Sequence, residues 1–169
     1  AGSTPVAWCC ARASSVTAQA AREGGASLGD VPTVFASELG EVQTAVTLLA
    51  MIRAEGIPSP MRFKNSVHNA ASGTASIAWQ NTRFSTAISA GPDLVAMGLL
   101  EAWAFVDLHG GDVVVSFAEE EIPAPLPRHG AYPALGVAFH LSTRPDGAHP
   151  VTLSALRLDA SVPVACALT

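Results

Sequence analysis

Two kinds of apolar pattern alternate along the first two thirds of this chain. The run Val31–Ala36 is short, apolar and ended by polar residues, which is typical of a buried strand. In Glu38–Ala54 the apolar residues recur at helical spacing instead, which predicts a helix. Ser37 is placed to cap that helix, and Gly56 is placed to end it.

The remaining elements follow from the same patterns. The loop Ile57–Phe63 contains two prolines and cannot be helical throughout. The segment after it is rich in small residues, so as a helix it can approach another backbone closely. The predicted helices are Ala11–Arg22, Asn65–Gln80 and Pro92–Asp107, and the predicted strands are Phe84–Ser89, Asp112–Phe117, Leu135–Ser142 and Val151–Leu158, the last two antiparallel. Strands alternate with helices until about Phe117, which predicts a single α/β domain over residues 1–169, a layered mixed sheet with helices packed on it.

Composition narrows the classes of protein to which the chain can belong. Of its 169 residues, 49% are apolar and only 14% are charged, which favours a well-covered domain or one that gives a face to a partner. The formal net charge of −5 and the lack of a basic run argue against nucleic-acid binding. No apolar stretch reaches the length of a membrane span, and the N-terminus shows no secretory signal.

The cysteines and histidines form no recognisable cofactor motif. Cys9, Cys10 and Cys166 lack the spacing of a disulfide framework or a zinc site, so we expect reduced thiols in a cytoplasmic protein. Four histidines, His109, His129, His140 and His149, are scattered without metal-ligand spacing. The glycines match no nucleotide-binding motif, and Glu119–Glu121 is interpreted as a solvated charge run.

The junction between the strand Phe84–Ser89 and the next helix is the place where chemistry is most expected. A nucleophile at the start of a helix benefits from the helix dipole, yet the turn Ala90–Asp93 (Ala90, Gly91, Pro92, Asp93) contains none. Ser89 is its nearest hydroxyl, and a strand-end or capping serine is the alternative interpretation. Asp93 is explained as a first-turn carboxylate that complements the helix dipole.

His68 is the titratable residue of greatest interest. A histidine can act as a general base near neutral pH, and Ser66 or Ser89 could then serve as the nucleophile of an acyltransferase or hydrolase. The alternative is a structural histidine that bonds to the backbone at the start of a helix. A third interpretation is a module that binds acyl carriers without catalysis.

Several long strings resemble the β-ketoacyl synthase-like N-terminal family. The resemblance is strongest in Ser59–Ala102, where SVHNA is followed by G and SIA, and it extends to Pro32–Glu41 and Asp112–Leu126. The segment Ala11–Ala21 also resembles the helix that precedes the first core strand of condensing enzymes. Members of this family include proteins that resemble chain length factors from aryl polyene (xanthomonadin-type) pigment clusters.

The resemblance implies a thiolase-like half-fold and a lost activity. In active synthases a nucleophilic cysteine follows the strand that corresponds to Phe84–Ser89, whereas this turn reads Ala90-Gly91-Pro92-Asp93. The catalytic histidines, or histidine and lysine, of active synthases lie in a C-terminal half that we expect this chain to lack. The resemblance therefore implies a subunit without catalysis of its own.

A chain-length-factor-like protein pairs with an active ketosynthase and shapes its acyl pocket. The implied partners are that ketosynthase and an acyl carrier protein, with a homodimer in isolation as a further expectation. The chain would need no cofactor or metal of its own, because the acyl chain on phosphopantetheine reaches the complex through the partner. The strand Phe84–Ser89 and the helix around His68 are expected to meet the partner. The candidate interface or pocket residues are Phe63, Val67, His68, Phe84, Ile88 and Met97. Plain core is the alternative for Phe63, Val67, Phe84 and Met97.

Overall fold

The computed structural model describes residues 8–58, 60–124, 126, 134–144 and 153. Its elements are α1 (Trp8–Glu23), β1 (Thr33–Ala36), α2 (Val42–Glu55), α3 (Pro60–Phe63), α4 (Ala70–Trp79), β2 (Ser85–Ile88), the 3-10 turn η1 (Gly91–Asp93), α5 (Leu94–His109), β3 (Asp112–Glu119) and β4 (Leu135–Ser142). The predicted strand Val151–Leu158 lies outside the described residues, apart from Leu153.

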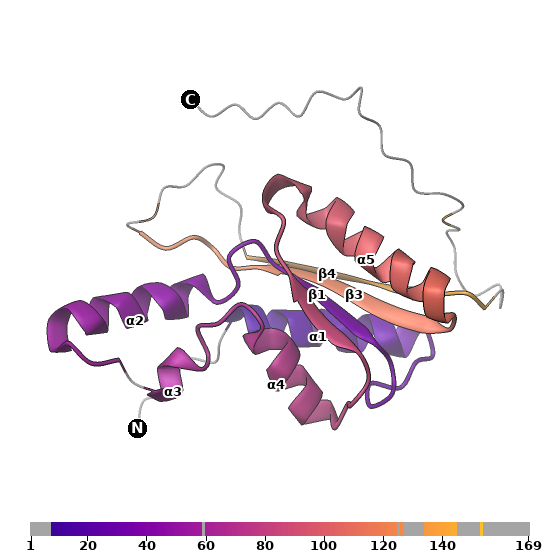
Figure 1. The fold of residues 1–169 in the computed structure, drawn as a ribbon, viewed down its shortest axis with the longest axis horizontal. Coiled ribbons are helices and arrows are strands. Elements are labelled where there is room, and N and C mark those ends of the chain that lie inside the picture. The colour runs from indigo at the N-terminus through magenta and orange to yellow at the C-terminus, as the bar shows by residue number, and fades with distance from the viewer. Residues whose placement is uncertain (1–7, 59, 125, 127–133, 145–152, 154–169) are drawn as a thin grey trace.

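The four described strands form one mixed sheet in the order β2-β1-β3-β4. β1 pairs in parallel with β2 and with β3, whereas β3 and β4 are antiparallel. Helix α5 covers one face of the sheet, and α1 and α4 lie on the other (Figure 1). The predicted α/β class and the mixed sheet are therefore confirmed, with β2 at an edge of the described sheet.

The central strands are apolar on both sides because each side is covered. Val34 and Val115 face α5, while Phe35 and Val114 face the layer of α1 and α4. A strand that is buried on both faces reads as a continuous apolar run, which is why β1 and β3 are recognisable in the sequence. The alanines of α4, Ala70, Ala71 and Ala75, are buried in a cluster with α1, as the small-residue pattern predicts.

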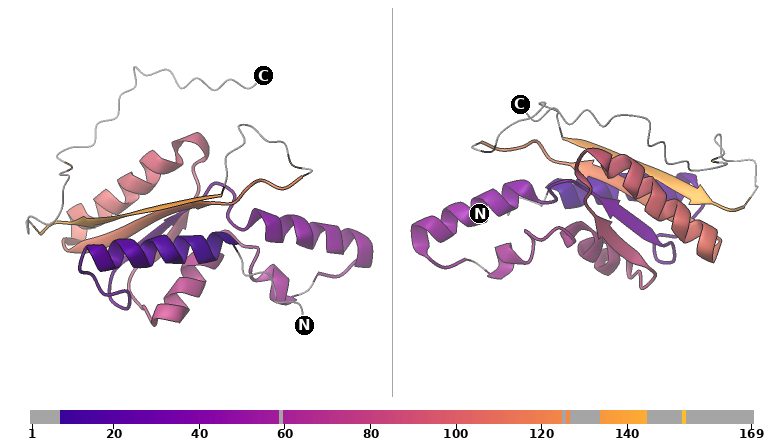
Figure 2. Two further views of the ribbon diagram at one scale, coloured as in Figure 1. Left: turned by 180° about the vertical axis from the view of Figure 1, so that it is seen from behind. Right: turned by 45° about the horizontal axis from the view of Figure 1, so that its top comes forward.

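Helices α2 and α3 form an arm that projects from these layers. Figure 2 shows α2 extending away from the sheet, with the chain turning back from its far end to α3, which lies alongside it. Helix α2 packs mainly against the short α3, and of its own residues Val42 and Leu48 are buried. We call residues 42–63 the arm. Its position is set mostly where α2 begins, next to the start of α1.

Three predictions of local structure need correction in this region. Helix α2 begins at Val42, because Gly40 adopts a left-handed φ of 60° that ends any helical path through it. The Ser37 hydroxyl therefore does not cap α2; it accepts a hydrogen bond from the amide of Gly40 at 2.8 Å. The supposed loop contains one helical turn, α3, which begins at Pro60 where proline is tolerated.

The helix expected from Asn65 begins only at Ala70. Tight turns occupy the preceding residues, with the amides of Asn65 and Ser66 bonded three residues back to Arg62 and Phe63. Helix α5 matches its prediction closely, preceded by η1.

Candidate functional site

The turn between β2 and α5, residues Ala90–Asp93, contains one left-handed residue and no cysteine or serine. Gly91 adopts a left-handed φ of 51°, and a Cβ added to it would meet no atom within 4 Å. The amide of Asp93 bonds to the Ala90 carbonyl at 3.1 Å, which closes the turn. Asp93 precedes α5 directly, and its side chain makes no capping hydrogen bond, so it acts on the helix start through its charge alone.

The predicted polar residues around this turn bind backbone groups. Ser89 donates its hydroxyl hydrogen to the Glu38 carbonyl at 2.9 Å, and Ser66 donates to the Phe63 carbonyl at 2.9 Å. His68 Nε2 donates to the Ser37 carbonyl at 2.8 Å. Within the described part of the chain, no hydrogen bond joins His68 to either serine. The geometry matches the structural interpretation of His68 and does not supply the paired hydroxyl and imidazole that a Ser/His enzyme needs.

The candidate interface residues differ from core residues in their exposure. Phe63, Val67, Phe84 and Met97 are between 36% and 57% exposed, so the alternative that they form the core is wrong for these four. Ile88 is half-buried and packs against the cluster beneath α5. Phe84 also stacks on Phe105 of α5, with ring centroids 4.8 Å apart. Sequence reasoning missed four more exposed apolar residues on the arm, Leu49, Ile52, Ile57 and Met61.

A second polar site, which sequence reasoning missed, lies where α1 and α2 begin. The run Glu119–Glu121 was interpreted as a solvated loop, but Glu120 is only 3% exposed and Glu119 is half-buried. Glu120 accepts hydrogen bonds from the amides of Cys9 and Gln43, and Glu41 accepts one from the amide of Cys10. Carboxylates at helix starts satisfy amides that have no partner inside the helix.

A small cavity adjoins these carboxylates. Glu41, Cys9, Ser37 and His68 are among the residues that line it. The volume open to a water-sized sphere is about 10 Å³, which is room for about one water molecule. The cavity is therefore too small for an acyl chain.

Comparison with known proteins decides the family. The family model of the β-ketoacyl synthase N-terminal domain matches residues 10–165. The chain belongs to the β-ketoacyl synthase family. Among curated protein sequences, none matches it.

Solved structures with a similar fold include the following two. One is a ketosynthase, ApeO, in complex with its chain length factor, ApeC, from Xenorhabdus doucetiae. The matched chain is 24% identical to this chain, with a TM-score of 0.70, and the match covers 80% of this chain and 57% of that chain. The other, the ishigamide ketosynthase/chain length factor, is 18% identical with a TM-score of 0.53, over 65% of this chain and 35% of that chain. The present chain thus corresponds to little more than half of the ketosynthase-type chain it matches, and the thiolase-like fold is confirmed.

Neither described cysteine of this β-ketoacyl synthase domain lies at the turn Ala90–Asp93. Cys9 and Cys10 are free and buried on the α1 face of the sheet, whereas the turn leads into α5 on the opposite face. Burial and the nearby charge of Glu41 raise the pKa of Cys9 to about 12, and burial also raises the pKa of Cys10. Both therefore remain neutral thiols. Cys166 lies outside the described residues.

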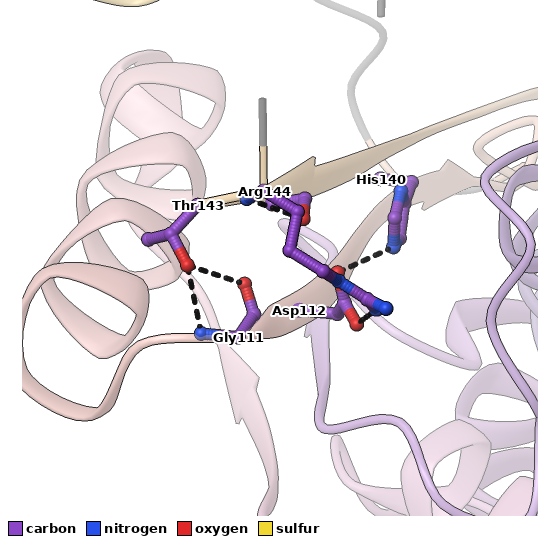
Figure 3. Close-up of polar contacts among 6 residues, drawn as sticks. Gly111, Asp112, His140, Thr143 and Arg144 are labelled. Atoms are coloured by element: carbon purple, nitrogen blue, oxygen red, sulfur yellow. Dashed lines mark hydrogen bonds and ion pairs between the residues drawn. The ribbon is translucent and has the colours of Figure 1, made fainter. Parts of the chain in front are cut away.

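Charged residues at the start of β3 and the end of β4 contact one another and hold the two strands together. Asp112 forms ion pairs with Arg144 and with His140, whose Nε2 lies 3.5 Å from Oδ1 of Asp112 (Figure 3). Beside it, the Thr143 hydroxyl accepts a hydrogen bond from the Gly111 amide at 3.0 Å. These contacts join the start of β3 to the end of β4. The His140 ring also packs against Gly24, directly after α1.

The described residues contain no group of three or more acidic, histidine or cysteine side chains that could hold a metal ion. Nor is any helix in the described ranges both long and apolar enough to cross a bilayer.

Proposed function

We propose that this chain is a non-catalytic β-ketoacyl synthase-like subunit, of the chain length factor kind, that pairs with an active ketosynthase. The observation that carries the proposal is the turn Ala90–Asp93, which keeps a left-handed residue at Gly91 and a helix start beyond it but offers no nucleophile. Carbon–carbon bond formation from a thioester by this family requires a thiolate at that turn. A domain that keeps the geometry and lacks the thiol is suited to support chemistry performed by another subunit.

The exposed apolar side chains support pairing. Helix α5 is apolar around most of its circumference, and only one of its faces is needed to cover the sheet. A helix that is apolar all round is normally covered on all sides. Met97 and Val95 on this helix, and Phe84 beside the β2 edge, stay exposed in the single chain. A partner subunit that packs on β2 and on the outer side of α5 would bury them.

The proposed role of the subunit is to shape the acyl pocket of its partner. A bulky side chain that reaches a tunnel of fixed width limits chain growth because additional methylene groups find no room. Phe63, Val67 and His68, which lie around the start of α4, are the residues we assign to this wall. The substrate would be an acyl chain held on the phosphopantetheine arm of an acyl carrier protein, in aryl polyene, polyketide or fatty-acid-type synthesis in the cytoplasm.

The test is co-purification of this chain with an active ketosynthase from the same organism. We expect a tagged chain to retain that ketosynthase through size exclusion, and we expect Phe84→Asp or Met97→Asp to weaken retention at least tenfold. Leu135→Asp is the matched control, because Leu135 is an exposed apolar residue on β4, at the opposite edge of the described sheet. Absence of a complex, together with unchanged products when the chain is omitted, would refute the proposal.

A further inference from the structure

One carboxylate ties together the starts of two helices. Glu120 follows β3 and uses both of its oxygens: Oε1 accepts from the Cys9 amide at 3.1 Å and Oε2 accepts from the Gln43 amide at 2.9 Å. Cys9 lies in the first turn of α1, and Gln43 lies in the first turn of α2. The positive ends of both helix dipoles therefore point at the same carboxyl group.

A second carboxyl group lies beside it. Glu41 Oε1 accepts a hydrogen bond from the amide of Cys10, the residue next to Cys9, so the two carboxyl groups occupy neighbouring positions at the start of α1. Glu41 is 2% exposed, and its Oε2 makes no hydrogen bond. No lysine, arginine or histidine in the described part of the chain forms an ion pair with Glu41 or Glu120.

The other titratable groups around Glu41 cannot balance two negative charges. From α1 it faces the neutral thiols of Cys9 and Cys10, and from the end of β3 it faces Glu120. Glu119 binds the Glu38 amide and the Ser37 hydroxyl and adds negative charge to the same region. Ahead of α4, His68 shares the small cavity, and its Nε2–H is directed to the Ser37 carbonyl. A proton is therefore the available counter-charge.

The arm depends on this joint. Most of α2 and α3 is exposed, and α2 packs mainly on α3 rather than on the sheet. Glu41 is the residue just before α2, and the Ala45 amide bonds to its carbonyl at 2.9 Å. The start of α2 is linked to α1 through Glu120, which binds the Cys9 and Gln43 amides, and through Glu41, which binds the Cys10 amide. If these hydrogen bonds break, the start of α2 loses its link to α1.

We propose that Glu41 and Glu120 form a pH-sensitive latch that fixes the arm against α1: the pair holds one proton, on Glu41, when the latch is closed, and loss of that proton frees the arm. When the latch opens, the O–H bond of Glu41 is broken and the proton passes to water, leaving two solvated carboxylates. The latch acts within this chain and does not depend on pairing with a ketosynthase.

The direction of titration agrees with this geometry. Burial, assisted by the negative charge of Glu120, raises the pKa of Glu41 above its usual value of 4.5. A carboxyl group whose pKa is higher in the closed state stabilises that state fully below pH 4.5 and loses the contribution as the pH rises through the raised pKa. At pH values between the pKa of Glu41 in the open state and its higher pKa in the closed state, opening releases one proton. The equilibrium constant for opening therefore increases by about tenfold per pH unit in this range and is constant above it.

Two measurements on the full chain test the latch. In the first, ¹³C NMR of the glutamate carboxyl carbons follows the titration of Glu41 directly in the wild type. In the second, amide hydrogen exchange is measured between pH 5 and 9 and corrected for the intrinsic effect of pH. We expect protection in residues 42–55 to fall by up to about tenfold per pH unit while β3 remains protected. Glu41→Gln, which keeps the acceptor for Cys10 and cannot ionise, should abolish this fall.

The matched control is Glu55→Gln, which removes the same charge from the exposed far end of α2. We expect this variant to retain the pH dependence of the wild type. The proposal is overturned if Glu41 titrates near 4.5, or if protection of α2 falls equally with pH in Glu41→Gln. If Glu41→Gln does not fold, the wild-type carboxyl titration still decides the matter.

Discussion

Replacing Gly98 with alanine tests how closely α5 must approach the sheet to hold the turn Ala90–Asp93 in place. Gly98 is buried in α5, and a Cβ built on it would lie 2.5 Å from Cε1 and 2.8 Å from Cζ of Phe117, and 3.4 Å from Cβ of Ala36. Separations below 3 Å are not tolerated, so either the Phe117 ring or the helix must move. The ring has little freedom, because Phe117 is buried and packs edge-on against Phe139.

Two effects of opposite sign determine the result. Alanine favours a helix over glycine by about 1 kcal/mol, whereas forcing an additional methyl group into a packed core costs about 1–3 kcal/mol. Gly73 in α4 isolates the first effect, because it is exposed and a Cβ there would meet nothing within 4 Å. We therefore expect Gly73→Ala to stabilise the domain by up to about 1 kcal/mol, and Gly98→Ala to be about 1–3 kcal/mol less stable than Gly73→Ala.

Urea unfolding of the three proteins, followed by far-UV circular dichroism, measures this difference. Comparing Phe117→Leu with the double variant Phe117→Leu/Gly98→Ala identifies the cause. Because leucine is smaller than phenylalanine, the stability lost through Gly98→Ala should be about half or less of the loss in the wild-type background. Equal stability of Gly98→Ala and Gly73→Ala would refute the reasoning, and so would a penalty that persists unchanged beside Phe117→Leu. Equal stability would mean that α5 does not require the close approach, whereas a persistent penalty would mean that the Phe117 ring is not its cause.

Two other predictions concern buried groups. Burial raises the pKa of the Cys9 thiol to about 12, so at pH 8 it should react with a disulfide reagent about a thousandfold more slowly in the folded chain than in urea. Mass spectrometry of the labelled peptide that contains Cys9 and Cys10 measures the two rates. Similar rates would contradict the assigned burial. Gly24→Ala should destabilise the domain by about 1–3 kcal/mol in urea, because its Cβ would lie 2.1 Å from Nδ1 of His140, and unchanged stability would show that the ring has another position.

The sequence predicted the layers well because they depend on simple periodicity. β1, β3 and α5 are recognisable since their apolar runs are buried, and the alanines of α4 indicated a close helix contact that the structure contains. Local signals were less reliable near Ser37. A serine before an apolar helix is a good capping signal, but the left-handed Gly40 delays the helix, and the amides at its start are bound by residues distant in sequence.

The buried carboxylates could not be predicted from sequence, and the reason is physical. Three successive glutamates normally remain in water, because burying a charge without a partner is costly. Glu120 is buried because the starts of α1 and α2 both contact it. Glu120 is 111 residues from Cys9 and 77 residues from Gln43 in the sequence, so no local pattern predicts this burial. The one hint was the position of Glu119 and Glu120 at the end of a strongly apolar strand, which draws them toward the interior.

The two polar sites of this domain differ in how much they depend on a second chain. The carboxylates at the start of α1 and α2 are enclosed and have partners within the chain, apart from one oxygen of Glu41. The turn at Gly91 is open: nothing in the described chain lies within 4 Å of the space a side chain would occupy there, and Met97 farther along α5 is exposed. An open turn beside uncovered apolar surface is costly for a chain that acts alone, because that surface remains in water. The same turn is well placed at a subunit boundary, where a partner covers the apolar residues and supplies the reactive group. This difference supports our proposal that a partner subunit performs the chemistry and that this chain shapes the pocket.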